Sequence, residues 1–169
     1  MYKILVIGLE SSCTKYVARL IAFNLKIVPF SWDGNDTVFD DRFLVRHRSI
    51  PWGHESRQSP IDVKTVHRDY DKIVIVTRDF NCSLLSKIKD HQPEVSIARE
   101  EHAQGVVILR RLSRHLSKNM CGYKLHYFSY ETAYIMRTVY VRRFLRELGI
   151  SSPIYQRCKE INAKHIKEA

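Results

Sequence analysis

Two short runs of aliphatic residues limit the folds open to this chain more than any other feature. Residues 4–7 read Ile-Leu-Val-Ile and residues 73–76 read Ile-Val-Ile-Val. A strand with one wet face alternates apolar and polar residues, so unbroken runs indicate strands buried on both faces of a parallel sheet. Further strands are predicted at 25–30, 42–47 and 124–130, and helices at about 14–25, 60–69, 81–90, 97–118, 131–147 and 153–167. The alternation predicts an α/β domain with a central, mainly parallel sheet flanked by helices.

Residues 1–169 are expected to form a single domain, because the chain shows no repeat, low-complexity segment or linker. At this length a chain buries about two thirds of its unfolded surface, which is enough for a core without staples. The four cysteines lack the spacing of metal ligands. No apolar run reaches the ~20 residues that cross a bilayer, and the chain starts directly with a strand. We therefore expect a cytoplasmic protein with no membrane span and with reduced thiols.

The net charge of +10 predicts an anionic partner. Much of the excess lies in residues 108–119 and 137–148, where arginines alternate with apolar residues as on the wet face of an amphipathic helix. The irregular segment 30–61 is rich in turn formers and in Trp, His and Arg, which is typical of a functional loop.

The junction after the first aliphatic run predicts an anion site. Gly8 ends the run, small polar residues follow, and apolar residues then return at helical spacing from Tyr16 to Leu25. A strand, loop and helix in this order leave unpaired backbone N–H groups at the helix N-terminus, where phosphate or sulfate can bind.

Two known loop chemistries fit this junction poorly. In a Walker A loop the second glycine would stand at Cys13, and Lys15 comes one residue late with no hydroxyl after it. A Mg²⁺-dependent kinase is therefore the less favoured alternative. Cys13 and Arg19 have the C-x₅-R spacing of some phosphatases, but the cysteine closes the loop instead of opening it and the arginine lies on the helix.

Three segments, in order, resemble the P-loop sulfotransferases. Residues 8–20 resemble that family's G-x-P-[RK]-S-G-T-T loop and the helix after it, which often reads L-A-R-L. Residues 76–88, VTRDFNCSLLSKI, resemble the second signature, R-[DN]-P-x-[DE]-x-x-x-S, and residues 127–150 resemble a strand ending in Y-E-D-L and a helix closing in L-G.

The resemblance implies a three-layer P-loop-type fold that binds 3′-phosphoadenosine 5′-phosphosulfate (PAPS) and transfers its sulfuryl group to a hydroxyl or amine without a metal. It implies that Arg78 and Ser86 bind the 3′-phosphate and that Tyr130 lies near the adenine. The residues expected around the 5′-phosphosulfate are Ser11, Ser12, Cys13, Thr14 and Lys15.

The chain departs from the family pattern at several positions. Ser11 replaces a basic residue, Cys13 a glycine and Phe80 a proline, and the family's C-terminal G-x-x-G-x-x-K loop is absent from residues 151–169. Lys15 is the natural substitute for the missing cation, so we predict that Lys15 stabilises the leaving phosphate.

Sulfuryl transfer to a hydroxyl also needs a base, and His47 is the first candidate. It follows an apolar run and resembles the family's K-T-H-L-P segment, while His54 is the second candidate. A histidine near its ordinary pKa of ~6.5 can accept a proton at neutral pH. The acceptor is expected to be a small molecule or a glycan, in a pocket that could include Arg46, Arg48, Arg57, Trp32 and Trp52. A non-catalytic nucleotide-binding or nucleic-acid-binding module is a further alternative, with nucleic acid the less favoured partner.

Overall fold

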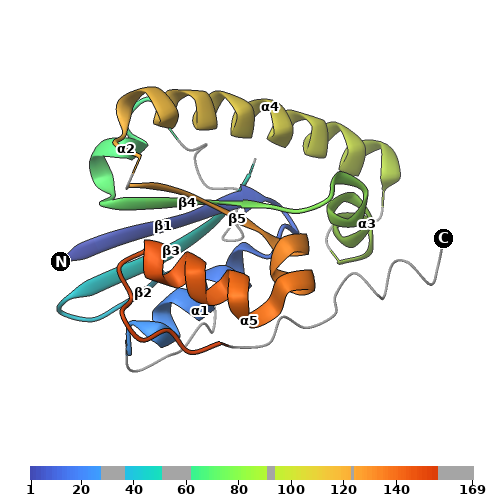
Figure 1. The fold of residues 1–169 in the computed structure, drawn as a ribbon. Coiled ribbons are helices and arrows are strands. Elements are labelled where there is room, and N and C mark those ends of the chain that lie inside the picture. Colours follow the sequence, from blue (N-terminus) through green and yellow to red (C-terminus); the bar gives the residue numbers. More distant parts are fainter. Residues whose placement is uncertain (28–36, 51–61, 91–93, 123, 156–169) are drawn as a thin grey trace.

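Four strands of the sheet run parallel to one another in the computed structural model, which describes residues 1–27, 37–50, 62–90, 94–122 and 124–155. β1 (Tyr2–Leu9) lies between β3 (Phe43–Ile50) and β4 (Lys72–Thr77), and β5 (Leu125–Ser129) follows β4. β2 (Thr37–Phe39) pairs antiparallel with β3, which gives the order β2-β3-β1-β4-β5 (Figure 1). The α/β class and the mainly parallel sheet predicted from the sequence are confirmed.

Helices cover both faces of this sheet (Figure 1). One face carries α1 (Thr14–Asn24) and α5 (Tyr130–Glu147), and the other carries α4 (Val95–Asn119) and the short α2 (Val66–Asp69). α3 (Phe80–Asp90) follows β4 and packs against α4 at the end of the sheet where β1 and β4 finish. None of the described helices is long and apolar enough to cross a membrane.

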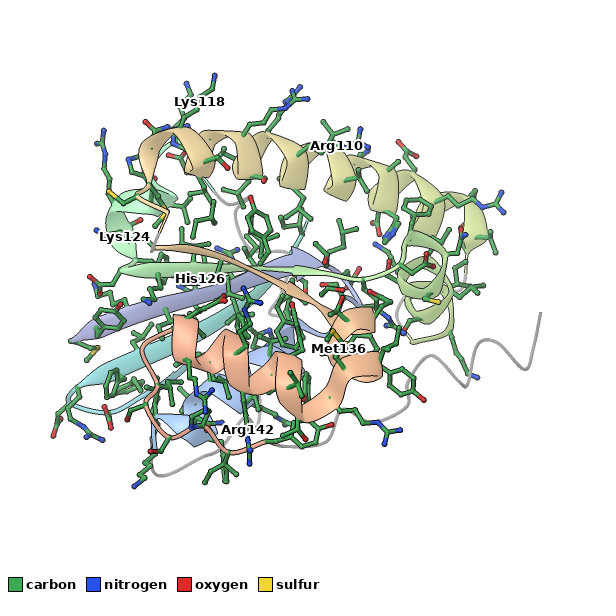
Figure 2. All side chains as sticks on the ribbon, in the orientation of Figure 1. Arg110, Lys118, Lys124, His126, Met136 and Arg142 are labelled. Atoms are coloured by element: carbon green, nitrogen blue, oxygen red, sulfur yellow. The ribbon has the colours of Figure 1, made fainter. Side chains whose placement is uncertain are left out.

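The aliphatic runs behave as their pattern predicts. In β1, Ile4 and Val6 pack with α1 and α5, while Leu5 and Ile7 pack with α4. Successive side chains of a strand point to opposite faces, so a strand between two helical layers must be apolar at every position. Side chains from both helical layers fill the space against the sheet (Figure 2).

Several predicted boundaries are wrong. The strand predicted at 25–30 is not formed in its described part, because residues 25–27 make the turn that ends α1, with Lys26 at a left-handed φ of 57°. The helix predicted at 60–69 is reduced to α2. The carboxylate of Asp62 accepts hydrogen bonds from the N–H of Lys64 and the hydroxyl of Thr65, and such turns compete with helix formation.

Other differences are a missed strand, shifted element ends and a kink inside one helix. β2 falls inside the segment predicted to be irregular, and β3 runs to Ile50 instead of residue 47. Residues 153–155 are not helical, and the rest of the helix predicted at 153–167 lies outside the described residues. α5 is kinked at Arg137, whose φ of 46° and ψ of −120° are not helical.

Candidate anion-binding site

The segment that joins β1 to α1 folds back over the end of β1. The N–H of Ser12 donates to the carbonyl of Leu9 at 2.9 Å. Ser11 and Cys13 have φ values of 63° and 70°, a left-handed conformation that residues with a Cβ seldom adopt. A turn containing left-handed residues can direct successive backbone N–H groups toward one anion.

The N-terminus of α1 strengthens this positive end. Cys13 is the N-cap residue, its side chain caps no N–H group, and the first turn contains no acidic residue. The first N–H groups of a helix have no intrahelical acceptor, and the helix dipole adds partial positive charge there. An anion would satisfy both requirements.

Gly8 lies against the loop, where a side chain would not fit. A Cβ built on Gly8 would meet the hydroxyl of Ser12 and would lie 2.7 Å from the carbonyl oxygen of Val76 on β4. The Ser12 side chain is buried at 1% exposure, and its hydroxyl has no hydrogen-bond partner among the described residues. Ser49 is the register partner of Gly8 on β3, and its buried hydroxyl likewise has no partner within the described ranges. Two buried hydroxyls with unused hydrogen-bonding capacity therefore flank Gly8.

Arg78 connects β4 to the loop. Its guanidinium donates a hydrogen bond from Nη1 to the carbonyl of Ser11 at 2.6 Å. The guanidinium also lies 5.3 Å from the centre of the Tyr130 ring, in cation–π geometry. The sequence motifs placed Arg78, Tyr130 and the loop in three separate segments, and the fold brings these segments into contact.

The turn after Arg78 is fixed by two carboxylates. Asp79 accepts the N–H of Cys82 at 2.9 Å, and this hydrogen bond lowers the pKa of the Asp79 carboxyl. The N–H of Asp79 donates to the carboxylate of Glu131 at 2.9 Å, which links the start of α3 to α5. Burial, together with the Asp79 carboxylate, raises the pKa of the Cys82 thiol, so this cysteine is not poised as a nucleophile.

A buried ion-pair cluster also contacts the loop, through Glu10. The ammonium of Lys87 on α3 is 2.8 Å from the carboxylate of Glu10 and 2.6 Å from that of Glu101 on α4, and its side chain is 1% exposed. The cluster attaches the loop to both helices. The sequence reasoning missed these residues, although Lys87 falls one helical turn after the buried residues Ser83 and Leu84 and so lies on the inner face of α3.

A second buried polar pair adjoins this cluster. The hydroxyl of Ser83 lies 3.1 Å from Nε2 of His102 and donates to the carbonyl of Phe80 at 3.0 Å. Burial, with the nearby charge of Lys87, lowers the pKa of His102, so its imidazole is neutral at pH 7. This pair was also missed, because it depends on how α3 packs against α4.

The remaining predicted site residues lie in different surroundings. Thr14 is buried and Lys15 exposed at the start of α1, while Ser86 is buried on α3. His47 is buried at 2% exposure within β3, on the same side of that strand as Ser49. The loop and Tyr130 are brought together by Arg78, which contacts the carbonyl of Ser11 and the Tyr130 ring. His54, Trp32, Trp52 and Arg57 lie outside the described residues.

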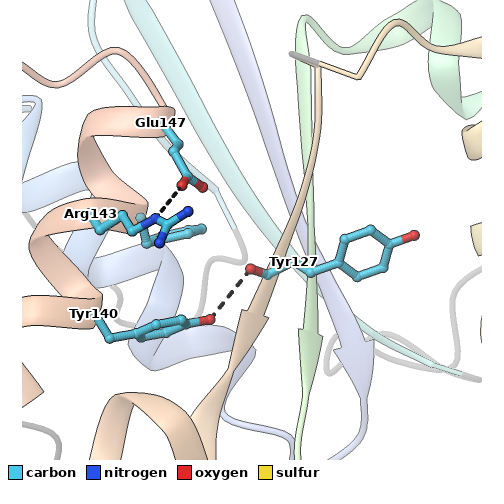
Figure 3. A pocket seen from close by; sticks show the side chains of 5 residues that line it. Tyr127, Tyr140, Arg143 and Glu147 are labelled. Carbon is cyan, nitrogen blue, oxygen red and sulfur yellow. Dashed lines mark hydrogen bonds and ion pairs between the residues drawn. The ribbon is translucent and has the colours of Figure 1, made fainter. Parts of the chain in front are cut away.

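A separate pocket of about 230 Å³ lies at the β5 edge of the sheet (Figure 3). It is lined by Tyr127, Tyr140, Arg143, Phe144 and Glu147, none of which belongs to the predicted site. Within the described part of the chain, no group of three or more His, Cys, Asp or Glu residues is arranged to hold a metal ion. Compared with known proteins, the chain matches no family model, no curated protein and no solved structure.

Proposed function

We propose that the protein transfers a sulfuryl group from PAPS to a hydroxyl or amine of a small-molecule or glycan acceptor. The observation that carries this proposal is the contact between Arg78 and the loop, because it joins the first two sulfotransferase-like motifs at one end of the sheet. The buried Ser12 hydroxyl and the close approach of the loop to Gly8 are the features expected where a phosphosulfate fits against backbone N–H groups.

Different residues of the candidate site are assigned to different parts of PAPS. The N–H groups at the start of α1, with Ser12 and Thr14, hold the 5′-phosphosulfate. The Arg78 guanidinium lies at the loop, and an arginine fork suits a terminal phosphate. Arg78 and Ser86 are assigned to the 3′-phosphate and Tyr130 to the adenine side, while exposed Lys15 places a cation at the leaving phosphate.

The acceptor must lose a proton as it attacks. PAPS supplies an activated sulfuryl group, whose bond to the phosphate oxygen breaks as the acceptor oxygen bonds to sulfur. His47 is assigned as the base that takes the acceptor proton. The assignment is supported by the register, which places His47 one pleat before Ser49, the residue beside Gly8, on the same side of β3.

Turnover distinguishes this proposal from the kinase alternative. The protein would be incubated with ³⁵S-labelled PAPS and a panel of phenols, amines and glycans, and in parallel with γ-³²P-labelled ATP and Mg²⁺. The expected result is ³⁵S transfer that a chelator leaves unchanged. Chelator-sensitive ³²P transfer without any ³⁵S transfer would replace the proposal with a metal-dependent kinase.

A further inference from the structure

The outer side of α4 carries a row of cations in its C-terminal half. Arg110, Arg111, Arg114 and Lys118, here named the α4 crest, are all exposed. Figure 2 shows Arg110 and Lys118 projecting from α4 away from the sheet. Arg110, Arg114 and Lys118 follow one another at intervals of four residues, so they lie about 6 Å apart along the helix.

The charge of the α4 crest is not neutralised by its neighbours. None of its four side chains forms an ion pair or a hydrogen bond with another described residue. The acidic residues of α4, Glu100 and Glu101, lie in the N-terminal half, where Glu101 pairs with Lys87. Unpaired cations in a row create a local positive potential that attracts anions.

We propose that the α4 crest is a docking surface for a linear acidic polysaccharide. The sheet side of α4 is taken up by Leu112 and Leu116, so its opposite side forms a ridge with the cations along the top. A single row on a ridge matches one chain of carboxylates or sulfates lying along the helix. It matches duplex nucleic acid less well, since the phosphates of a duplex form two rails on either side of a groove.

Other anionic partners lack the features they need on this surface. Single-stranded nucleic acid is usually held by aromatic side chains on which bases stack, and the α4 crest contains none. A helix that lies on a membrane inserts large apolar residues. Among the cations of the α4 crest, however, the only exposed neighbour is Ser117, and the nearest exposed apolar residue of α4 is Val107, one turn before Arg110.

This inference does not depend on the proposed function. The crest lies on the outer side of α4, whereas the anion-binding loop lies at the end of the sheet beside α3, as the Glu10–Lys87 contact shows. Docking there could be retained in a protein that transfers no sulfuryl group.

The test is binding of the full chain to short dextran sulfate, measured by isothermal titration at several salt concentrations. A triple variant, Arg110→Gln with Arg114→Gln and Lys118→Gln, removes three crest charges. The control triple variant, Arg19→Gln with Arg142→Gln and Arg146→Gln, removes three exposed charges from α1 and α5 on the other side of the sheet; Figure 2 shows Arg142 there.

We expect the unsubstituted protein to bind dextran sulfate with a slope of about −3 in a plot of log binding constant against log salt concentration, from ~0.7 for each of four charges. The crest variant should bind dextran sulfate at least about tenfold more weakly, because the modest contributions of three exposed ion pairs add up. The control variant should lose less than about threefold in affinity. Equal losses in the two variants would overturn the proposal. So would equal or tighter binding of a duplex DNA of matched charge, or of anionic phospholipid vesicles, in place of dextran sulfate.

Discussion

Gly8 is the residue at which the loop depends most directly on a missing side chain. In Gly8→Ala the new methyl group would meet the Ser12 hydroxyl and the Val76 carbonyl, so we expect a loss of about 1–3 kcal/mol in the free energy of unfolding, the usual cost of overpacking. The measurement is urea unfolding, with Gly122→Ala as the matched control, because nothing lies within 4 Å of the Cβ added there. Equal stability of the two variants would show that the loop does not pack as described.

Lys87 should be the most costly lysine to replace. Lys87→Met leaves the carboxylates of Glu10 and Glu101 together without their cation. Removing one partner of a buried ion pair costs about 3–5 kcal/mol, and we expect the lower end because Glu101 remains 29% exposed. Lys118→Met, at an exposed position, should change stability by less than about 0.5 kcal/mol in the same unfolding experiment. Similar losses in both variants would contradict the structural role given to Lys87.

His102 should make the fold less stable in mild acid. Its pKa in the folded protein lies below the ordinary value of 6.5, so below pH 6.5 the unfolded chain takes up a proton that the folded chain does not. Stability from this group is complete above pH 6.5 and falls as the pH drops, by up to about 1.4 kcal/mol per pH unit.

Unfolding measured at pH 7.5 and at pH 5 checks this expectation. Asp79 does not contribute in that window, because its pKa is lowered from 3.8. His102→Gln should show a smaller loss of stability between the two pH values than the parent. The same loss in both proteins would mean that His102 does not titrate abnormally.

The contacts around the candidate site differ in how far the sequence could predict them. Arg78 and the loop residues stand in motifs whose order along the chain is visible, and the fold places them in contact. The Glu10–Lys87–Glu101 and Ser83–His102 contacts join residues from separate elements, so no local pattern marks the partners. Sequence periodicity shows which side of a helix is buried, but not what it meets there.

At the scale of elements, β5 is an edge strand of the sheet formed by the described residues, and its outward backbone groups are partly covered by Tyr140. The carbonyl of Lys124 accepts the N–H of Ile73 on β4, so Tyr127 and Ser129 direct their backbone groups to the open side. The Tyr140 hydroxyl accepts the N–H of Ser129 at 2.8 Å. It donates to the carbonyl of Tyr127 at 3.5 Å (Figure 3). Burial raises the pKa of Tyr140, which keeps this hydroxyl protonated.

Tyr140→Phe should therefore uncover the edge. We expect a loss of about 1 kcal/mol in stability from the missing hydrogen bonds and stronger self-association, since an open edge pairs with other strands. Tyr127→Phe is the control, because its hydroxyl contacts Ser113 at 2.8 Å on the α4 side. Sedimentation at rising concentration is the measurement. If Tyr140→Phe associates no more than Tyr127→Phe, the edge is protected by something else.

Elements were predictable where hydrophobic burial alone decides their conformation. β1 and β4 were found because both of their faces are buried. The segment at 60–69 was misjudged because the side chain of Asp62 forms a turn that competes with the helix, and β2 was missed because three residues are too few to show a period.

At the scale of the whole molecule, the order of the strands determines where the candidate site lies. β1 and β4 are adjacent and parallel, so the segments that follow them, the loop and Arg78, emerge at the same end of the sheet. α/β proteins bind ligands at the carboxyl ends of such strands. The alternation of strands and helices predicts this class of fold, but not the pairing of β1 with both β3 and β4, which requires long-range contacts.

The central claim is that this end of the sheet binds a nucleotide through its 3′-phosphate. The most direct test is isothermal titration of the parent protein with 3′-phosphoadenosine 5′-phosphate, with adenosine 5′-phosphate as the control ligand. The two ligands differ only in the phosphate assigned to Arg78 and Ser86. A charged hydrogen bond is worth about 1.5–3 kcal/mol, so the bisphosphate should bind about 10- to 100-fold more tightly. Equal and weak binding of the two nucleotides would contradict the account.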